Sequence, residues 1–131
     1  MNRYGAERSE FGFEDLEVYQ KAKALRKRVY KLTKILPDEE KYALAIQMKK
    51  AAVSVTNNIA EGYGRRNWQD NIHFCRISLG SLMELADDFG VCVDEEYAKA
   101  EHILTLRKDA AVVLRLLNGY IKYLGERKVA N

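Results

Sequence analysis

Apolar residues recur at intervals of three and four along most of this 131-residue chain, which is the period of a helix rather than the alternation of a strand. The repeat falls into four segments, and each one predicts an amphipathic helix with a single apolar face. In chain order, the apolar positions are Val18, Ala22, Leu25, Val29, Leu32 and Leu36; Tyr42, Ala45, Met48, Ala52, Val55 and Ile59; Ile72, Cys75, Leu79, Leu82, Ala86 and Phe89; and Ala100, Ile103, Leu106, Ala110, Val113, Leu117, Ile121 and Leu124.

Local signals predict where these helices begin and end. The first helix begins after the acidic stretch EDLE and stops near Pro37, because the residue before a proline avoids the helical region. The second and fourth helices open with acidic runs, DEEK at 38–41 and DEE at 94–96, which suit the positive end of a helix dipole. We expect residues 1–12 to be a flexible N-terminal segment and residues 126–131 a C-terminal tail, with the bundle between them at 13–125.

Short turns between amphipathic helices make consecutive helices antiparallel neighbours. The sequence therefore predicts an all-α, up-down-up-down four-helix bundle, and its length suits one domain with a real core. No apolar run approaches the roughly 18–20 residues of a membrane span, and the first ten residues lack the apolar stretch of a signal peptide. Cys75 and Cys92 have no CxxC spacing, so we interpret them as reduced thiols of a cytoplasmic protein.

The stretch SVTNNIAEGYGRRN, at 54–67, places glycines and arginines where one helical pattern ends. A phosphate-binding loop needs G-x-x-x-x-G-K-[ST] after a strand, whereas here a helix precedes Gly62 and Gly64 and no lysine–hydroxyl pair follows. Glycine just past a periodic segment instead predicts a left-handed C-terminal cap. Asn67 then caps the next helix, with Asp70 in its first turn. We interpret the stretch as a helix–turn–helix connection.

Three blocks in order, FEDLEVYQKA, QMKKAAVSVTNNIAEGYGRR and SLGSLMEL, carry a family resemblance. They resemble the bacterial four-helix-bundle family first noticed as proteins encoded in intervening sequences of 23S ribosomal RNA. That family reads F-x-D-L-x-V-aromatic, then Q-M/I-basic-basic-A-A-x-S-I, N-I-A-E-G with a nearby arginine, and G-S-L-x-E. LLNGYIKYL at 116–124 suits its last helix, although the chain is about two helical turns shorter than the family between Glu84 and Tyr97.

The resemblance implies a protomer that assembles into a ring-like homopentamer and carries a basic surface for RNA or DNA. A distant relative is the accessory protein of diversity-generating retroelements, which is thought to bind a reverse transcriptase and its RNA. A protein partner such as a reverse transcriptase is therefore one expectation for this chain. No catalytic residues are attributed to the family, so the resemblance transfers none.

Basic residues supply the candidate site for nucleic acid. Residues 21–34 hold seven lysines and arginines and no acid, and two further basic pairs follow along the chain. Clusters of this kind contact phosphates, and Tyr19, Tyr30 and Tyr63 could stack on unpaired bases. The candidate nucleic-acid-binding residues are Lys23, Arg26, Lys27, Lys31, Lys34, Lys49, Lys50, Arg65 and Arg66.

A purely structural interpretation of the charges stays open beside this one. Acids at helix starts and bases near helix ends are what the helix dipole favours in any bundle, and a net charge of +3 does not itself indicate a polyanion partner. Residues 84–101 hold seven acids against Lys99 alone, and beside Asp38–Glu40 they predict one acidic end. The alternative function is therefore a structural bundle that binds only proteins.

Catalytic chemistry has little support in the sequence. A di-iron bundle needs Glu-x-x-His on two helices, but the residues three positions before His73 and His102 are Asp70 and Lys99. We expect no enzyme activity, no metal and no cofactor, and we expect Glu61 and Glu84 to cap a turn or pair with an arginine across helices. Gly80, in mid-helix, predicts a close helix approach, either within the protomer or between subunits.

Overall fold

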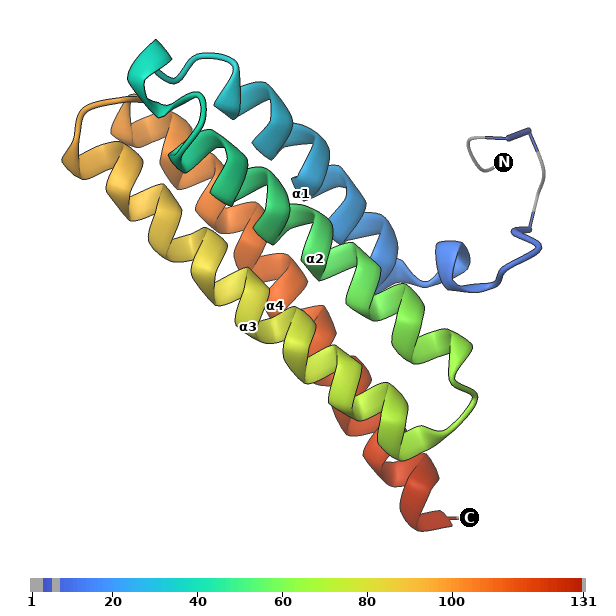
Figure 1. Ribbon diagram of the computed structural model, residues 1–131. Helices are drawn as coiled ribbons and strands as arrows, with labels where there is room; N and C mark the ends of the chain where they lie inside the picture. The colour runs from blue at the N-terminus through green and yellow to red at the C-terminus, as the bar shows by residue number, and fades with distance from the viewer. Residues whose placement is uncertain (1–3, 6–7, 131) are drawn as a thin grey trace.

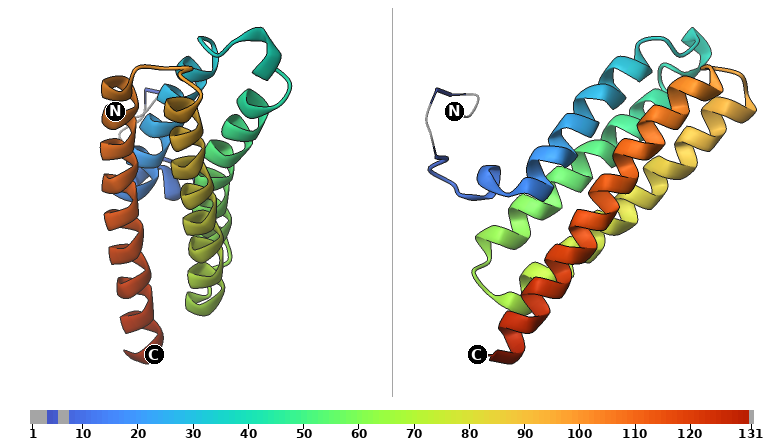
Figure 2. Two further views of the ribbon diagram at one scale, coloured as in Figure 1. Left: turned by 90° about the vertical axis from the view of Figure 1, so that its left-hand side faces the viewer. Right: turned by 180° about the vertical axis from the view of Figure 1, so that it is seen from behind.

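Each apolar segment forms the inner face of a helix in the computed structural model, which describes residues 4–5 and 8–130. The helices are α1 (Glu17–Thr33), α2 (Leu44–Gly64), α3 (Trp68–Asp94) and α4 (Ala100–Ala130), with short 3-10 turns η1 (Phe13–Asp15) and η2 (Asp38–Glu40), and the described residues contain no strand. Consecutive helices run antiparallel (Figures 1 and 2), and α1 and α3 each pack against both α2 and α4. The predicted up-down-up-down four-helix bundle is confirmed.

The predicted apolar stripes meet in one core. Val29, Met48, Ile59, Phe89 and Leu117 are fully buried there. Tyr42 is an exception, because it is 80% exposed. Its predicted place in the second helix was wrong: Asp38–Glu40 form the turn η2, and α2 starts only at Leu44.

The acidic run at 94–96 ends one helix rather than opening the next. Asp94 is the last residue of α3, and Glu96 then takes a left-handed conformation with φ 59°. The backbone N–H of Tyr97 donates to the carbonyl of Cys92 at 2.8 Å and closes the turn, so that α4 begins at Ala100. The predicted start of the fourth helix was therefore wrong.

Both chain ends that we expected to lie outside the bundle contain described structure or contacts. Helix α4 continues to Ala130, where we expected a separate tail at 126–131, and Arg127 lies over the Tyr123 ring at 4.9 Å. Near the other end, Ser9 donates to Asp15 through its backbone N–H at 3.1 Å. The flexibility of 1–12 stays a prediction, and residues 1–3, 6–7 and 131 lie outside the described residues.

The connection between α2 and α3 is a helix–turn–helix, but its left-handed residue is Arg66, with φ 55°, rather than a glycine. The glycine cap was therefore a wrong prediction, since Gly62 and Gly64 both belong to α2. Gly62 is required for another reason: a Cβ there would lie 2.7 Å from Asn71 Oδ1 and 3.0 Å from the Asn71 carbonyl oxygen. The predicted cap of α3 is confirmed, because Asn67 Oδ1 accepts the Asp70 N–H at 3.0 Å.

Polar contacts fix the register of α2 against α3. Ser78 donates to the Val55 carbonyl at 2.7 Å, and the hydroxyls of Ser54 and Ser81 lie 2.7 Å apart. Farther along, Gln47 Nε2 donates to Asp88 Oδ1 at 3.0 Å. Since buried polar groups cost free energy unless they are hydrogen-bonded, these pairs favour one sliding position of the two helices.

Asp88 is only 2% exposed, and its Oδ2 has no hydrogen-bond partner among the described residues. Burial, with the nearby charges of Asp87 and Glu84, raises the pKa of the Asp88 carboxyl to about 6. Cys75 and Cys92 are also buried, and both are free. Burial raises the pKa of the Cys75 thiol to about 12 and that of Cys92 to about 11.

Gly80 does not mediate a close approach within the protomer. It is exposed, and no atom of the described residues outside its own stretch of helix lies within 4 Å of a Cβ placed on it. The first of the two explanations for this glycine is therefore wrong, and contact between subunits stays a prediction.

Candidate nucleic-acid interface

The lysines of α1 lie on the solvent-facing side of the helix, opposite its buried stripe. Lys27, Lys31 and Lys34 are exposed, and Lys23 is half-buried in the same row. Spacings of three and four residues place them on one side of the helix, and the sequence between them contains no acid. This row is positive along its whole length.

The two arginines of α1 have structural partners. Arg26 Nη1 donates to Thr56 Oγ1 of α2 at 2.9 Å, so its guanidinium lies at the junction of α1 and α2. Arg28, which the prediction did not include, forms an ion pair with Asp109 and faces α4 instead. The two arginines therefore flank the lysine row, Arg26 on the side of α2 and Arg28 on the side of α4.

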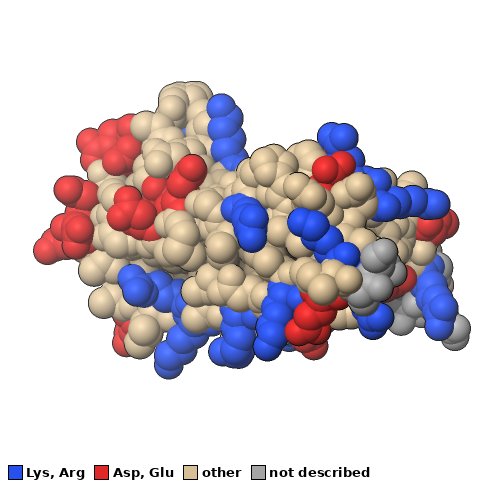
Figure 3. All heavy atoms as spheres, turned by 90° about the horizontal axis from the view of Figure 1, so that it is seen from below, with Lys and Arg blue, Asp and Glu red and all other residues tan. Residues whose placement is uncertain are grey.

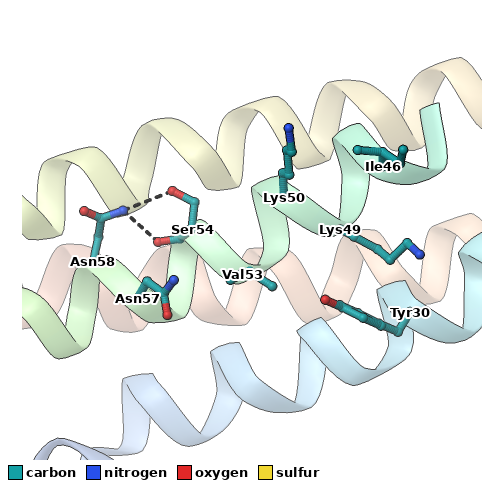
Figure 4. A pocket seen from close by; sticks show the side chains of 8 residues that line it. All are labelled: Tyr30, Ile46, Lys49, Lys50, Val53, Ser54, Asn57 and Asn58. Carbon is teal, nitrogen blue, oxygen red and sulfur yellow. Dashed lines mark hydrogen bonds between the residues drawn. The ribbon is translucent and has the colours of Figure 1, made fainter. Parts of the chain in front are cut away.

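Lys49 and Lys50 form a basic pair on α2. The Lys49 Nζ lies 5.7 Å from the centroid of the Tyr30 ring, which joins the two helices across a surface hollow (Figure 4). Lys50 is exposed beside it and also borders the groove toward α3. The structure therefore brings Lys49 next to α1, whereas Lys50 points toward α3 (Figure 4).

Arg65 and Arg66 directly follow α2, at the turn that leads into α3. Arg65 follows Lys49 by sixteen residues, which is about 24 Å of helix. The Arg65 guanidinium pairs with Glu61 at 2.9 Å and lies 4.9 Å from the centroid of the Phe74 ring. The predicted basic residues thus form a track along α1 and α2 rather than one patch.

Of the tyrosines predicted to stack on bases, Tyr19 does not qualify, because it is buried against Phe13. Tyr63 is 38% exposed beside Gly12, and Tyr30 is 41% exposed in the middle of the track. Sequence reasoning missed the polar residues that line the end of the hollow away from Tyr30. They are Ser54, Asn57 and Asn58 on α2, whose polar spacing in SVTNN was the available signal.

One end of the bundle is acidic, as predicted. The α1–α2 and α3–α4 connections lie at the same end in Figure 1, and Tyr97 donates to Glu40 Oε2 between them at 2.7 Å. That hydrogen bond, with burial and the surrounding carboxylates, raises the pKa of Tyr97 to about 12. Figure 3 shows Asp and Glu gathered at this left-hand end, whereas Lys and Arg are scattered among other residues along the rest of the face.

The two motif glutamates have different surroundings. Glu61 pairs with Arg65 one turn along its own helix, so the expected pairing with arginine is present but does not cross between helices. Glu84 is exposed at the groove between α2 and α3. In the part of the chain that the structure describes, no three His, Cys, Asp or Glu side chains gather as metal ligands would. None of its helices has an apolar stretch that could cross a bilayer.

Fold and surface together define a helical bundle protein with a basic track and an acidic end. A family model described as 23S rRNA-intervening sequence protein matches residues 14–119, and the chain belongs to that family. A search of curated proteins found no match. Among solved structures, the chain resembles a protein of unknown function from the S23 ribosomal protein family of Bacteroides thetaiotaomicron VPI-5482. The TM-score is 0.74 at 24% identity over 80% of this chain and 98% of the other, a likeness that shows the shared fold.

Proposed function

We propose that this chain is a non-enzymatic, oligomeric adaptor of the bacterial cytoplasm that associates with nucleic acid or ribonucleoprotein. The observation that carries the proposal is the lysine row on α1, which runs without an acid from residue 21 to residue 34 and continues onto Lys49. Phosphate contact needs clustered cations, and the acidic end would keep a polyanion on this face. The family description, which names ribosomal RNA intervening sequences, supports a connection with RNA.

Self-association, with a homopentamer favoured, is the second part of the proposal. It is supported by the outer side of α2 and α3, where Gly80 meets open space and Ile77 is 40% exposed one turn away. Ile46 on α2 is 37% exposed as well. Small and apolar residues on an open helix face let a second backbone approach closely, and such an approach would explain a glycine at position 80.

Titration of a labelled single-stranded RNA at two salt concentrations tests the nucleic-acid function. With about five phosphates contacted, affinity falls about 100-fold between about 50 and about 200 mM salt, because the slope of log affinity against log salt is about −0.7 per contact. Lys27→Glu and Arg65→Glu weaken binding and make that slope shallower by about 0.7 or more each. Lys108→Glu is the matched control, because it makes the same charge change at an exposed position of α4.

Two outcomes would contradict the proposal. Salt-independent binding, or equal loss in all three variants, would remove the basic track as the interface. The solution mass from light scattering on the same sample tests the oligomer: a mass near five protomers supports the ring, and a monomer overturns it.

The alternative is a bundle that binds only proteins, including a partner such as a reverse transcriptase. The observation in its favour is the presence of large apolar side chains on the exposed sides of α3 and α4, Met83 and Leu104. Absence of RNA binding at low salt, with an oligomeric mass, would favour this alternative.

A further inference from the structure

We propose that the hollow between α1 and α2 holds one unpaired RNA base, stacked on Tyr30. This inference rests on the proposed nucleic-acid function and names the part of the strand that the track recognises. The hollow has a volume of about 490 Å³ and is open to solvent along the seam of the two helices (Figure 4). Its lining residues are Tyr30, Ile46, Lys49, Lys50, Val53, Ser54, Asn57 and Asn58.

The lining divides into parts that suit a nucleotide. Tyr30, Ile46 and Val53 are apolar or aromatic surfaces for a flat ring. Lys49, beside Tyr30, and Lys50, which points toward α3, are cations for the flanking phosphates. None of the described residues that line this hollow is acidic. Four other hollows of the described surface each include a carboxylate, from Glu61, Glu84, Asp109 or Glu101. The absence of a carboxylate therefore makes the hollow beside Tyr30 a better site for a polyanion than the other four.

Tyr30 is available for stacking. Its ring is 41% exposed, and the Lys49 ammonium lies 5.7 Å from its centroid. A cation–π contact at an exposed site is weaker than the stacking of a base on an aromatic side chain. A base would therefore displace the ammonium from the ring, and the flexible lysine stem could then carry the charge to the adjacent phosphate.

Two amide groups on α2 line the end of the hollow away from Tyr30 (Figure 4). Asn58 uses its Nδ2 on the Ser54 carbonyl at 2.8 Å and on Ser54 Oγ at 3.0 Å, which leaves its Oδ1 as an acceptor. Asn57 is exposed and makes no hydrogen bond to any described residue, so its donor and acceptor are both available. Asparagine offers adjacent donor and acceptor groups that match the edge of a base such as adenine.

The base must be unpaired. In duplex RNA the bases are stacked inside the helix and their major-groove edges lie in a deep, narrow groove, so no base face is open to a tyrosine, whereas an unpaired base can turn outward onto an aromatic face. A hollow on the seam of two helices presents no element that could enter a duplex groove. Paired RNA would therefore contact only the lysines.

The test uses the full-length protein and an oligouridylate strand that carries the fluorescent base 2-aminopurine at one position, because uridines stack weakly and leave the free probe bright. Tyr30→Ala weakens binding about 5- to 150-fold, which corresponds to the ~1–3 kcal/mol measured for removing an aromatic stacking platform. Tyr30→Phe keeps the ring and binds within about twofold of the unmodified protein. The salt slope of Tyr30→Ala stays unchanged because no phosphate contact is lost. Quenching of 2-aminopurine, which reports stacking, disappears in Tyr30→Ala.

Tyr42→Ala is the matched control. Tyr42 is also an exposed tyrosine beside a lysine, with Lys41 Nζ 5.6 Å from its ring centroid, but it lies outside the hollow. If the unmodified protein binds RNA and Tyr30→Ala binds as tightly as Tyr42→Ala, the base site is overturned while the adaptor function stands. If the unmodified protein binds no RNA, both proposals are overturned.

Discussion

Helices α2 and α3 approach closely at Gly62, and Gly62→Ala tests this contact. Gly62 is buried near the end of α2, where it faces the first turns of α3. A Cβ at this position would lie 2.7 Å from Asn71 Oδ1, 3.0 Å from the Asn71 carbonyl oxygen and 3.1 Å from the Phe74 Cβ. The carbonyl belongs to the backbone, so α3 itself must move to admit a methyl group.

The expected loss follows from three contributions. Overpacking of a tight contact costs about 1–3 kcal/mol. Asn71 also donates to the Tyr120 hydroxyl of α4 at 3.2 Å, and weakening such a bond removes about 0.5–1.5 kcal/mol. The better helix propensity of alanine offsets at most about 1 kcal/mol of this. The net destabilisation is about 1–3 kcal/mol, which lowers the melting temperature by about 4 °C per kcal/mol for a chain of this length.

Thermal and urea unfolding, followed by circular dichroism at one fixed protein concentration, measure this change. Gly119→Ala is the control, because Gly119 is exposed in α4 and a Cβ there meets no atom within 4 Å among the described residues. The control gains up to about 1 kcal/mol from helix propensity alone. A Gly62→Ala protein at least as stable as the unmodified one, beside a stabilised control, would refute the close-contact argument.

Two further predictions concern α3. Gly80→Gln lowers the solution mass measured by light scattering, whereas Gly119→Gln leaves it unchanged; equal masses for both variants would remove the face around Gly80 from the oligomer. Asp88 has a folded-state pKa of about 6, above its unfolded value of about 3.9. Between these two pH values the native state binds more protons than the unfolded state, so the free energy of unfolding falls as the pH rises from about 4 to about 6. Asp88→Asn keeps an Oδ1 that accepts from Gln47 but cannot ionise, so this fall disappears. In urea unfolding, the stability of the variant relative to the unmodified protein therefore rises from about pH 4 to about pH 6 and is constant above; parallel pH profiles of the two proteins would show that Asp88 does not cause the fall.

The core could be predicted because burial follows the helical period. Val29, Met48 and Leu117 were placed inside by spacing alone, and all three are fully buried. The Asn67 cap was predictable as well, since a short polar side chain before an apolar repeat has few other uses. Both features depend on residues within one or two turns of each other.

The missed features depend on contacts between elements. Gly62 looked like a helix end, but Asn71 of the next helix fixes its role, and Arg66 takes the left-handed position instead. The start of α2 was missed because the acids at 38–40 suit a 3-10 turn as well as a helix. Local propensity cannot choose between such options when the packing partner is remote in sequence.

The candidate site, like the fold, has one part that the sequence predicts and another that it does not. Helical spacing alone predicted the row of Lys27, Lys31 and Lys34 on one side of α1. The hollow beside it was not predictable, because it forms only where α1 packs against small and polar residues of α2. On their own, Asn57 and Asn58 look like an ordinary solvent-facing stretch of helix.

The two buried thiols give this bundle its own reporters of local opening. Cys75 and Cys92 are seventeen residues apart on α3, about 25 Å along the helix, so they lie toward opposite ends of the molecule. A thiol that is buried and has a raised pKa reacts with an alkylating reagent only after the surrounding helices separate. The ratio of the two labelling rates therefore shows which end of the bundle opens first.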